Sequence, residues 1–484
     1  MLTKYEPVFS RRAHQDEALA KAAGRPGFGY IMEMGTGKTK TTLDEIGELF
    51  CAGQLPAVLM LAPKGVYTNW ETDEIPKHWS EDFRSHTVRG IWRGGGTVAN
   101  RDEISRLFSA DPLTLKFMSM NIEALGASEK AFSVALEFVK RQRAMVVIDE
   151  STMIKNPQAA RTKAADRLTE HSPIRRFLSG QPTPNGPMDI YSQVNWAHPG
   201  YLGRSFFGFR AKYAVLQKQY FGTRAVQQIV GYRDLPELRD RLKPITFRKR
   251  KEECLDLPPQ IYLPIRNVEL TDQQRRVYNE VKENATAELS SQSFVTATSA
   301  LTIMLRLHQI LCGHVTDEEG RVHLLETNRP AAMLEQLEEM GKDGIVWATY
   351  RPDIERIEEA LRKRYGASKV VSYHGGVSQA DRDLAKRRFQ DGDADWFVGT
   401  PQAASRGLTL VRTANTLYYS NSHNLDHRDQ SESRTHRDGQ HWPCVYGDLA
   451  VRDTIEDRTI IPALRKKMDL ASVIMGDPER RWLV

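Results

Sequence analysis

The chain has 484 residues, 40% of them hydrophobic and 27% charged, which is ordinary for a soluble globular protein and leaves room for about two to four domains. The 68 basic and 62 acidic residues leave a net charge of +6, which permits a nucleic-acid partner without demanding one. Four widely spaced cysteines without a CxxC pair exclude a disulfide framework, and no run of about 18 apolar residues predicts a membrane span.

Residues 1–15 contain no apolar core of the kind found in secretory signals, so we expect a cytoplasmic protein. Beyond them, short apolar runs alternate with amphipathic stretches in two parts of the chain. The runs of the first part are residues 29–34, 57–63, 115–120, 144–150 and 176–180, and those of the second are residues 344–350, 369–375, 395–400 and 416–421. Strands that alternate with helices predict parallel sheets covered on both faces, so the sequence predicts two α/β domains.

A phosphate-binding turn is predicted where the first strand ends. The sequence GYIMEMGTGKTKTTLDEI joins an apolar strand to a helix through Gly35, Thr36 and Gly37. Glycine backbone N–H groups can surround phosphate oxygens, Lys38 can bind the outer phosphates of ATP, and Thr39 can ligate Mg²⁺. The full motif has a glycine where this chain has Met32, so the match is partial.

Two carboxylates follow the apolar run at 144–148. Asp149 and Glu150 would stand at the carboxyl edge of a buried strand. There Asp149 would hold Mg²⁺, and Glu150 would orient or deprotonate the attacking water. Together with GTGKT in the same domain, this pair predicts hydrolysis of a nucleoside triphosphate.

The two predicted domains are separated by a different kind of sequence. Residues 200–255 are aromatic-rich and basic, residues 255–264 read as a proline-punctuated linker, and residues 271–315 read as helices. His308, Cys312 and His314 lie close together there. Two histidines and one cysteine without a fourth ligand make a poor structural zinc site, so we expect a packed helix ending at Gly313.

A pair of arginines follows the last predicted strand. In DQSESRTHRDGQ, Gln430, Arg434 and Arg437 have the spacing i, i+4 and i+7, which places them on one face of a helix. Two guanidinium groups suit the charge that develops on a transferring phosphoryl group. Because they lie in the other domain from Lys38, we expect ATP to draw the two lobes together and hydrolysis to release them.

These motifs, in this order, resemble those of superfamily 2 helicases and, within them, the Snf-type translocases. The resemblance rests on AHQ at 13–15, EMGTGKT at 33–39, LAPKGVYTNWETDEIPKHW at 61–79, VVIDESTMIKNP at 146–157 and LSGQPTPNG at 178–186, then on YHGGVSQADRDLAKRRFQ, GTPQAASRGLTL and DQSESRTHRDGQ. It departs from the family in DEST and SGQP, where Ser151 and Gln181 replace the usual residues of the motifs tied to coupling hydrolysis to movement.

The resemblance implies an α/β fold of two RecA-like lobes with a nucleotide cleft between them. It implies an N-terminal lobe at 1–250 with a helical tail at about 200–250, a linker at 251–270, a C-terminal lobe at 271–463 and a bracing helix at 464–484. Gln15 would read adenine, and Gln430 would join the nucleotide site. The implied contacts to the DNA backbone are Lys64, Asn69, Asn121, Thr349, Arg351, His374 and Thr400.

The function implied is that of an ATP- and Mg²⁺-dependent motor that moves along duplex DNA. Since the motor would account for the whole chain, we expect a compact enzyme that remodels branched DNA by branch migration, fork regression or unwinding. An RNA helicase and the motor subunit of a restriction or defence complex are the alternatives. A DNA clamp without ATPase activity is disfavoured by Glu150 and the two arginines.

Overall fold

The computed structural model describes residues 4–94, 96–221, 224–291, 297–317, 319–404 and 408–478. Residues 405–407 of the GTPQAASRGLTL motif and the last six residues of the predicted bracing helix lie outside this part. The chain divides into two compact units. Unit 1 comprises Met1–Val215, Tyr232–Asp256 and Leu470–Asp477, and unit 2 comprises Leu216–Gly231, Leu257–Asp469 and Pro478–Val484.

Unit 1 is built on a parallel seven-stranded sheet with the strand order β3-β4-β2-β5-β6-β1-β9. Its strands are β1 (Gly27–Met32), β2 (Ala57–Ala62), β3 (Thr87–Trp92), β4 (Leu115–Asn121), β5 (Met145–Ile148), β6 (Arg175–Ser179) and β9 (Thr246–Lys249). Its main helices are α1 (Ala13–Ala22), α2 (Lys38–Cys51), α3 (Ile75–His78), α4 (Glu81–Ser85), α5 (Val98–Ser109), α6 (Ile122–Ala127), α7 (Glu129–Gln142), α8 (Ala160–Thr169), α9 (Ile190–Ala197), α10 (Phe206–Tyr213) and α11 (Leu235–Leu242), with short turns η1 (Trp70–Glu74), η2 (Ser151–Ile154), η3 (Pro187–Asp189) and η4 (Lys251–Glu253).

Successive strand residues of unit 1 face opposite sides of the sheet, and each side packs against helices. Leu59 and Val146 belong to a core with Phe138 of α7. Met60 and Val147 belong to a separate core with Ile46 of α2. This alternation is why apolar runs with no polar positions form these strands.

Unit 2 contains the second parallel sheet, with the order β10-β18-β17-β14-β16-β15, and β11 also pairs with β18. Its strands are β10 (Gln260–Tyr262), β11 (Arg266–Asn267), β14 (Gly344–Trp347), β15 (Val370–Tyr373), β16 (Trp396–Gly399), β17 (Asn415–Tyr418) and β18 (Cys444–Ala450), besides the antiparallel pair β12 (His314–Thr316) and β13 (Val322–Leu324). Its helices are α12 (Asp272–Ser291), α13 (Ala297–Cys312), α14 (Arg329–Met340), α15 (Arg351–Tyr365), α16 (Gln379–Gln390), α17 (Pro401–Ala404) and α18 (Leu425–Glu432), with short turns η5 (Ala367–Lys369) and η6 (Glu456–Ile460).

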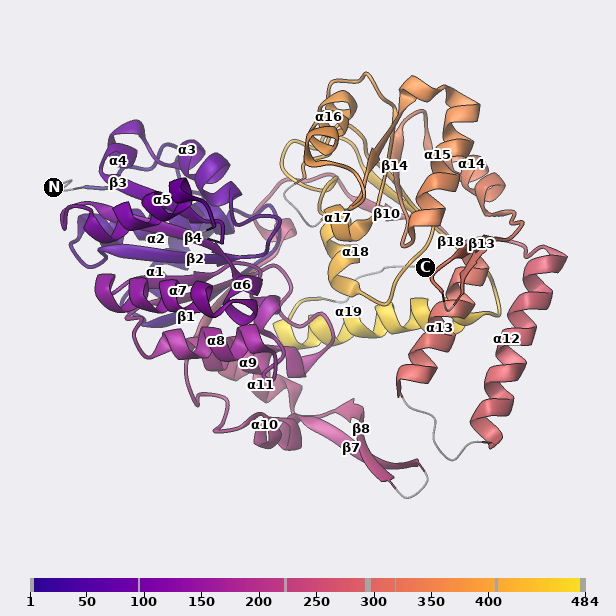
Figure 1. Cartoon of the computed structure of the whole chain (residues 1–484), viewed down its shortest axis with the longest axis horizontal. Helices are drawn as coiled ribbons and strands as arrows, with labels where there is room; N and C mark the ends of the chain where they lie inside the picture. Colours follow the sequence, from indigo (N-terminus) through magenta and orange to yellow (C-terminus); the bar gives the residue numbers. More distant parts are fainter. Residues whose placement is uncertain are drawn as a thin grey trace. The chain divides into compact units, whose positions relative to one another are not determined.

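Two further elements have residues in both units. The hairpin of β7 (Ala214–Phe221) and β8 (Arg224–Tyr232) forms its own two-stranded sheet, and α19 (Ile461–Met475) is the last helix (Figure 1). Among the described residues, no helix has both the length and the apolar character needed to cross a membrane. The predicted fold class of α/β lobes with parallel sheets is confirmed in both units, each of which has its helices around its sheet (Figure 1).

Candidate nucleotide site and arginine segment

Three predicted motifs of unit 1 meet because their strands are neighbours. β6 lies between β1 and β5, and all three strands are parallel. Their carboxyl ends therefore share one edge of the sheet, which is where open α/β sheets bind ligands. The turn after β1 carries Lys38, the turn after β5 carries Asp149 and Glu150, and Gly180 follows β6 directly. The sheet order thus gathers residues that are up to 142 positions apart (38 to 180) in the chain.

The turn after β1 has a backbone that favours glycine. Gly35 has φ of 85° and Gly37 has φ of 93°, both in the left-handed region. A Cβ atom on Gly37 would stand 2.1 Å from Nε2 of Gln15, which places the predicted adenine-reading residue directly against the turn. The 14-residue helix α2 begins at Lys38, so the positive end of its dipole lies at the turn, with Thr36 just before it and Thr39 in its first turn.

Lys38 is held by the backbone of its own turn. Its Nζ donates a hydrogen bond to the carbonyl oxygen of Met32, 2.7 Å away. Burial lowers the pKa of Lys38, while the nearby carboxylates of Glu150 and Asp149 act to raise it. The residue that breaks the full motif, Met32, is therefore the one whose carbonyl holds the lysine. Gly180 is also close, since a Cβ placed on it would lie 3.7 Å from the same Nζ.

Asp149 accepts two hydrogen bonds, one of them from a tryptophan of the 61–79 motif to which the sequence assigned no role at this site. The indole Nε1 of Trp70 donates to Oδ2 at 3.0 Å, and the backbone N–H of Glu150 donates to Oδ1 at 2.9 Å. Burial raises the pKa of Asp149, and Lys38 and Trp70 oppose this shift. Trp70 is buried at 3% exposure, so its N–H fixes the orientation of the carboxylate.

Glu150 has a left-handed backbone, with φ of 48° and ψ of 60°. Such a conformation in a non-glycine residue costs about 1–3 kcal/mol and is concentrated at functional sites. The next residue, Ser151, is fully buried and donates from Oγ to Oε1 of Gln193 at 2.6 Å. Gln193 in turn donates from Nε2 to the carbonyl of Pro182 at 2.7 Å. The two motifs that depart from the family, DEST and SGQP, are thus joined through Gln193.

Two more residues at this edge were not recognised in the sequence. Arg248 donates to the carbonyl of Gly180 at 2.9 Å and pairs with Glu33 at 3.2 Å. His14, one position before Gln15, donates from Nε2 to the carbonyl of Thr36 at 2.8 Å. Both residues tie the phosphate turn to neighbouring segments.

The residues at this edge have the chemistry to hold a triphosphate with Mg²⁺. Glycine N–H groups, a helix N-terminus and Lys38 suit phosphate oxygens. The Thr39 hydroxyl and the Asp149 carboxylate are hard oxygen donors, which Mg²⁺ prefers. A Cβ at position 37 would stand 2.1 Å from Nε2 of Gln15, so a larger residue there would have to displace this side chain.

In unit 2, the arginine segment, defined here as Glu432–Gln440, corrects the prediction of a single helical face. α18 ends at Glu432, so Arg434 and Arg437 lie beyond the helix that contains Gln430. The backbone N–H groups of Arg434 and Thr435 reach carbonyls three residues back, at 3.2 and 3.3 Å, which forms tight turns instead of a helix. The prediction failed because the spacing suits a helix while Thr435 also bonds from Oγ1 to the Glu432 carbonyl, at 3.1 Å.

A shared acceptor nevertheless brings the two arginines together. Arg434 and Arg437 each donate from Nη1 to the carbonyl oxygen of Leu408, at 3.2 and 3.0 Å. Arg434 is buried at 6% exposure. Gln430 donates from Nε2 to Asp426 at 3.0 Å. The two guanidinium groups therefore meet at one carbonyl oxygen.

The predicted DNA contacts of unit 1 lie near the ends of adjacent strands. Asn121 ends β4, where it pairs in register with Ala62 at the end of β2. Lys64 follows β2 and its side chain is exposed. Asn69 stands immediately before Trp70, at the start of η1. The Asn121 side chain caps α6 by accepting from the N–H of Glu123, so its carbonyl oxygen is already engaged.

The predicted DNA contacts of unit 2 follow three neighbouring strands. Thr349 and Arg351 follow β14, His374 follows β15 and Thr400 follows β16. A Cβ on Gly376 would lie 3.2 Å from the His374 ring and 3.3 Å from Cζ of Arg351, which shows that these two side chains share one surface. Burial lowers the pKa of His374, so its ring is more readily neutral than that of a free histidine.

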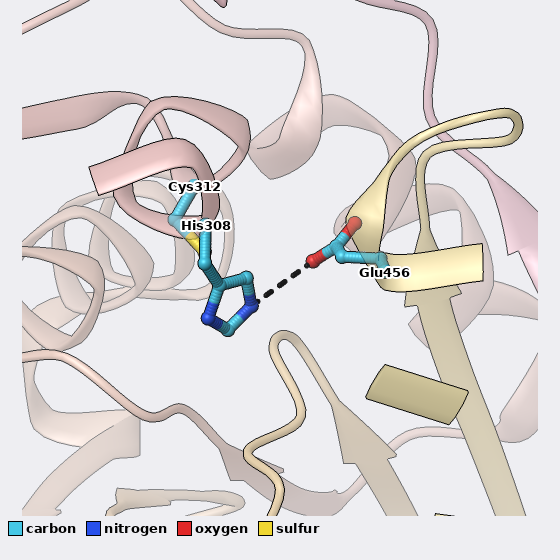
Figure 2. Close-up of side chains that lie close together, drawn as sticks. All are labelled: His308, Cys312 and Glu456. Carbon is cyan, nitrogen blue, oxygen red and sulfur yellow. Dashed lines mark ion pairs between the residues drawn. The ribbon is translucent and has the colours of Figure 1, made fainter. Parts of the chain in front are cut away.

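The candidate metal ligands of the sequence are rearranged by the fold. His308 and Cys312 lie near Glu456, with ligand atoms within 4.8 Å of one another, whereas His314 pairs with Asp353 at 3.4 Å. Figure 2 shows the His308 ring directed at the Glu456 carboxylate, 3.3 Å away. Glu456 also binds the buried Arg329 at 2.5 Å, which keeps the pKa of Glu456 at about 2, although burial acts to raise it. Arg329 supplies the positive charge that a metal ion would otherwise bring.

Two known protein-family models match most of this chain. A model of the SNF2-related domain matches residues 30–315, and a model of the helicase conserved C-terminal domain matches residues 328–439. The chain is 24% identical to human "DNA annealing helicase and endonuclease ZRANB3", over 84% of this chain and 35% of that protein. It is 22% identical to "DNA repair and recombination protein RAD54-like" of Drosophila ananassae, over 92% of this chain and 59% of that protein.

A third relative is an "Uncharacterized ATP-dependent helicase" of Mycoplasma genitalium, which is 23% identical over 89% of this chain and 39% of that protein. The chain therefore spans between about a third and three fifths of the length of these relatives. Among solved structures, the Sulfolobus solfataricus SWI2/SNF2 ATPase core in complex with dsDNA aligns with a TM-score of 0.43 and 21% identity, covering 98% of this chain and 96% of that one.

Proposed function

The chain belongs to the SNF2-related family, and from this premise we propose that it is an ATP-hydrolysing motor that moves along duplex DNA and remodels branched DNA. The observation that carries the proposal is the order β1-β6-β5, which brings the phosphate turn, Gly180 and the two carboxylates to one sheet edge. Relatives named for DNA annealing and for repair and recombination support the choice of substrate.

Hydrolysis would use the residues of this edge in separate roles. Lys38 would leave the Met32 carbonyl and bind the outer phosphates of ATP, a short movement for a long side chain. Gln15, Gly35, Thr36, Gly37 and Gln430 would bind the remainder of the nucleotide. Thr39 and Asp149 would hold Mg²⁺, which when bound neutralises charge on the phosphate oxygens. Glu150 would accept the proton of the attacking water. Its left-handed backbone sets the direction in which its side chain leaves the chain.

Arg434 and Arg437 would contribute from unit 2 by stabilising charge on the transferring phosphoryl group. They would exchange the Leu408 carbonyl for phosphate oxygens, a gain because a guanidinium group binds an anionic oxygen more strongly than a neutral carbonyl oxygen. An arginine in this role accelerates phosphoryl transfer by about 10³–10⁵-fold. The exchange would make hydrolysis depend on the state of unit 2, as movement along DNA requires.

DNA would be held by its backbone. Lys64, Asn69, Asn121, Thr349, Arg351, His374 and Thr400 are the proposed contacts. Contacts to phosphates position a protein without reading bases, which a motor on arbitrary sequence needs. Trp70 would connect the DNA contacts of unit 1 to the nucleotide site, because it follows Asn69 in the chain and donates a hydrogen bond to Asp149.

The test is the rate of ATP hydrolysis by the full chain with duplex, forked and single-stranded DNA and with RNA, each at several salt concentrations. We expect duplex and forked DNA to stimulate the rate most, with stimulation that weakens as salt rises. Stimulation by RNA alone would replace the proposal with an RNA helicase. No stimulation by any nucleic acid would refute the motor. Conversion of a mobile four-way junction then tests the remodelling of branched DNA.

A further inference from the structure

The segment Pro258–Tyr262 connects the unit boundary to the arginine segment. Pro258 lies two positions after Asp256, which ends the second stretch of unit 1. Its carbonyl oxygen accepts a hydrogen bond from Nε2 of His436 at 2.9 Å. His436 stands between Arg434 and Arg437 in sequence and is buried at 4% exposure. A backbone atom at the start of unit 2 is therefore bonded to the turn that carries both arginines.

Tyr262 makes a second connection at the other end of this segment. Its hydroxyl donates to Oε2 of Glu432 at 2.9 Å, at the end of α18. Its ring stacks on that of Tyr446 in β18, with centroids 5.1 Å apart and planes at 22°. The Tyr446 hydroxyl reaches the Glu432 carbonyl and the Thr435 hydroxyl, both at 3.2 Å. The arginine segment is thus bonded to β10 and β18 from two sides.

Glu432 also anchors the segment to the interior of unit 2. Nε of Arg428 pairs with its carboxylate at 2.7 Å, and the same guanidinium binds Asp448 of β18 at 2.5 Å. Arg428, Glu432 and Asp448 are each less than 4% exposed. Removal of one partner from such a buried network leaves charge without compensation, so the network fixes Glu432 firmly. Tyr262 is therefore bonded to a firmly held residue, Glu432, at which the arginine segment begins.

We infer that Pro258–Tyr262 is a positioning element for Arg434 and Arg437, so that the chain connection between the units sets where the two guanidinium groups lie. The inference rests on the proposed role of these arginines in hydrolysis. A displacement of about 1 Å at a catalytic group can cost about 100-fold in rate. A displacement of the chain at Asp256 would reach the His436 bond at Pro258, two residues later, and the Glu432 bond at Tyr262, six residues later. His436 and Tyr262 act through the arginines and need not touch ATP.

The experiment uses the full chain with Tyr262→Phe, which removes one hydroxyl and keeps the stacked ring. We expect the DNA-stimulated kcat for ATP to fall about tenfold, with KM for ATP and duplex affinity changed by less than about twofold. In an Arg437→Ala background the same substitution should add less than about twofold, because its effect passes through the arginines. Thermal unfolding is measured for every variant, and His436→Phe tests the second contact should Tyr262→Phe fail to fold.

Tyr278→Phe is the matched control. Its hydroxyl accepts from the N–H of Ile455 at 3.1 Å, in the same unit and at 6% exposure, and no hydrogen bond described for Tyr278 reaches the arginine segment. It should leave kcat within about twofold. An unchanged kcat in both Tyr262→Phe and His436→Phe, or an equal loss with and without Arg437, would overturn the positioning role. A normal kcat in Arg437→Ala alone would instead refute the arginine assignment of the proposed function, which keeps the two failures apart.

Discussion

At the scale of single residues, Trp70 orients the carboxylate of Asp149. We predict that Trp70→Phe will reduce ATP hydrolysis by about 10-fold or more and the free energy of unfolding by about 1–3 kcal/mol. The physical reason is the loss of the N–H that holds Oδ2 of Asp149 at 3.0 Å in a buried position. Steady-state kinetics and chemical denaturation measure the two effects. Phe retains most of the ring volume, so an unaltered rate would show that the hydrogen bond has no catalytic consequence.

Substitutions of Glu150 and Lys38 should both nearly abolish hydrolysis but differ in their effect on ATP binding. We predict that Glu150→Gln and Lys38→Ala each lower kcat by at least about 100-fold, since one removes the proton acceptor and the other the phosphate-binding charge. Glu150→Gln should retain affinity for ATP, whereas Lys38→Ala should lose it. Equilibrium binding of a fluorescent ATP analogue separates the two. Normal turnover in either variant would mean that the residue has been assigned the wrong role.

Lys38, Asp149 and Glu150 could be proposed from the sequence because each belongs to a short motif that comes after a predicted strand. The sequence could not identify the hydrogen bond of Trp70 to Asp149, which spans 79 positions, or that of Arg248 to Gly180, which spans 68. Both depend on which strands are neighbours, and alternation of strands and helices does not specify strand order. The helical face of Arg434 and Arg437 was wrong for a local reason, because spacing alone does not exclude a series of tight turns.

At the scale of elements, the turn between β1 and α2 should be sensitive to change at Gly37. We predict that Gly37→Ala will impair both folding and ATP binding, because the added Cβ meets Gln15 at 2.1 Å and the φ of 93° disfavours alanine. The backbone effect alone costs about 1–2 kcal/mol. Gly53→Ala is a matched control, with φ of 70° and no atom within 4 Å of the added Cβ. In measurements of thermal unfolding and ATP binding, both substitutions should lose the stability that the left-handed backbone costs, whereas a larger loss of stability and a loss of ATP binding should appear only in Gly37→Ala if the contact with Gln15 matters.

The hydrogen bond between Ser151 of η2 and Gln193 of α9 should affect the coupling of ATP hydrolysis to DNA more than the binding of ATP. We predict that Ser151→Ala lowers the ratio of DNA-stimulated to basal hydrolysis, because Gln193 loses a donor at 2.6 Å and with it the connection from Glu150 to Pro182. Leaving a buried acceptor without a donor also costs about 1–3 kcal/mol of stability. Hydrolysis measured with and without duplex DNA gives the ratio. A proportional fall of both rates would indicate that Ser151 supports the site without coupling it.

For the whole molecule, the proposed function predicts that nucleotide and DNA together make the chain more compact. With Glu150→Gln, which should bind ATP without hydrolysing it, we expect the radius of gyration to fall when ATP, Mg²⁺ and duplex DNA are added. Small-angle scattering with the DNA contrast-matched measures this change. Lys38→Ala is the control and should not respond to ATP. An unchanged radius in Glu150→Gln would contradict closure around the nucleotide.

Unit 1 is assembled from three separate stretches of chain, and the last of them, Leu470–Asp477, is made after the long stretch Leu257–Asp469 of unit 2. It supplies Ile474, buried at 1% exposure in the core beside α11, and Asp477, which pairs with Arg248 at 2.6 Å. On the ribosome, the first lobe would therefore emerge with Ile474 missing from its core and with Arg248 paired to Glu33 but not yet to Asp477, and it could mature only after residues 470–477 have been made. A fragment cut after Asp256 should accordingly be prone to aggregation, and a synthetic peptide spanning residues 461–478 should improve its solubility.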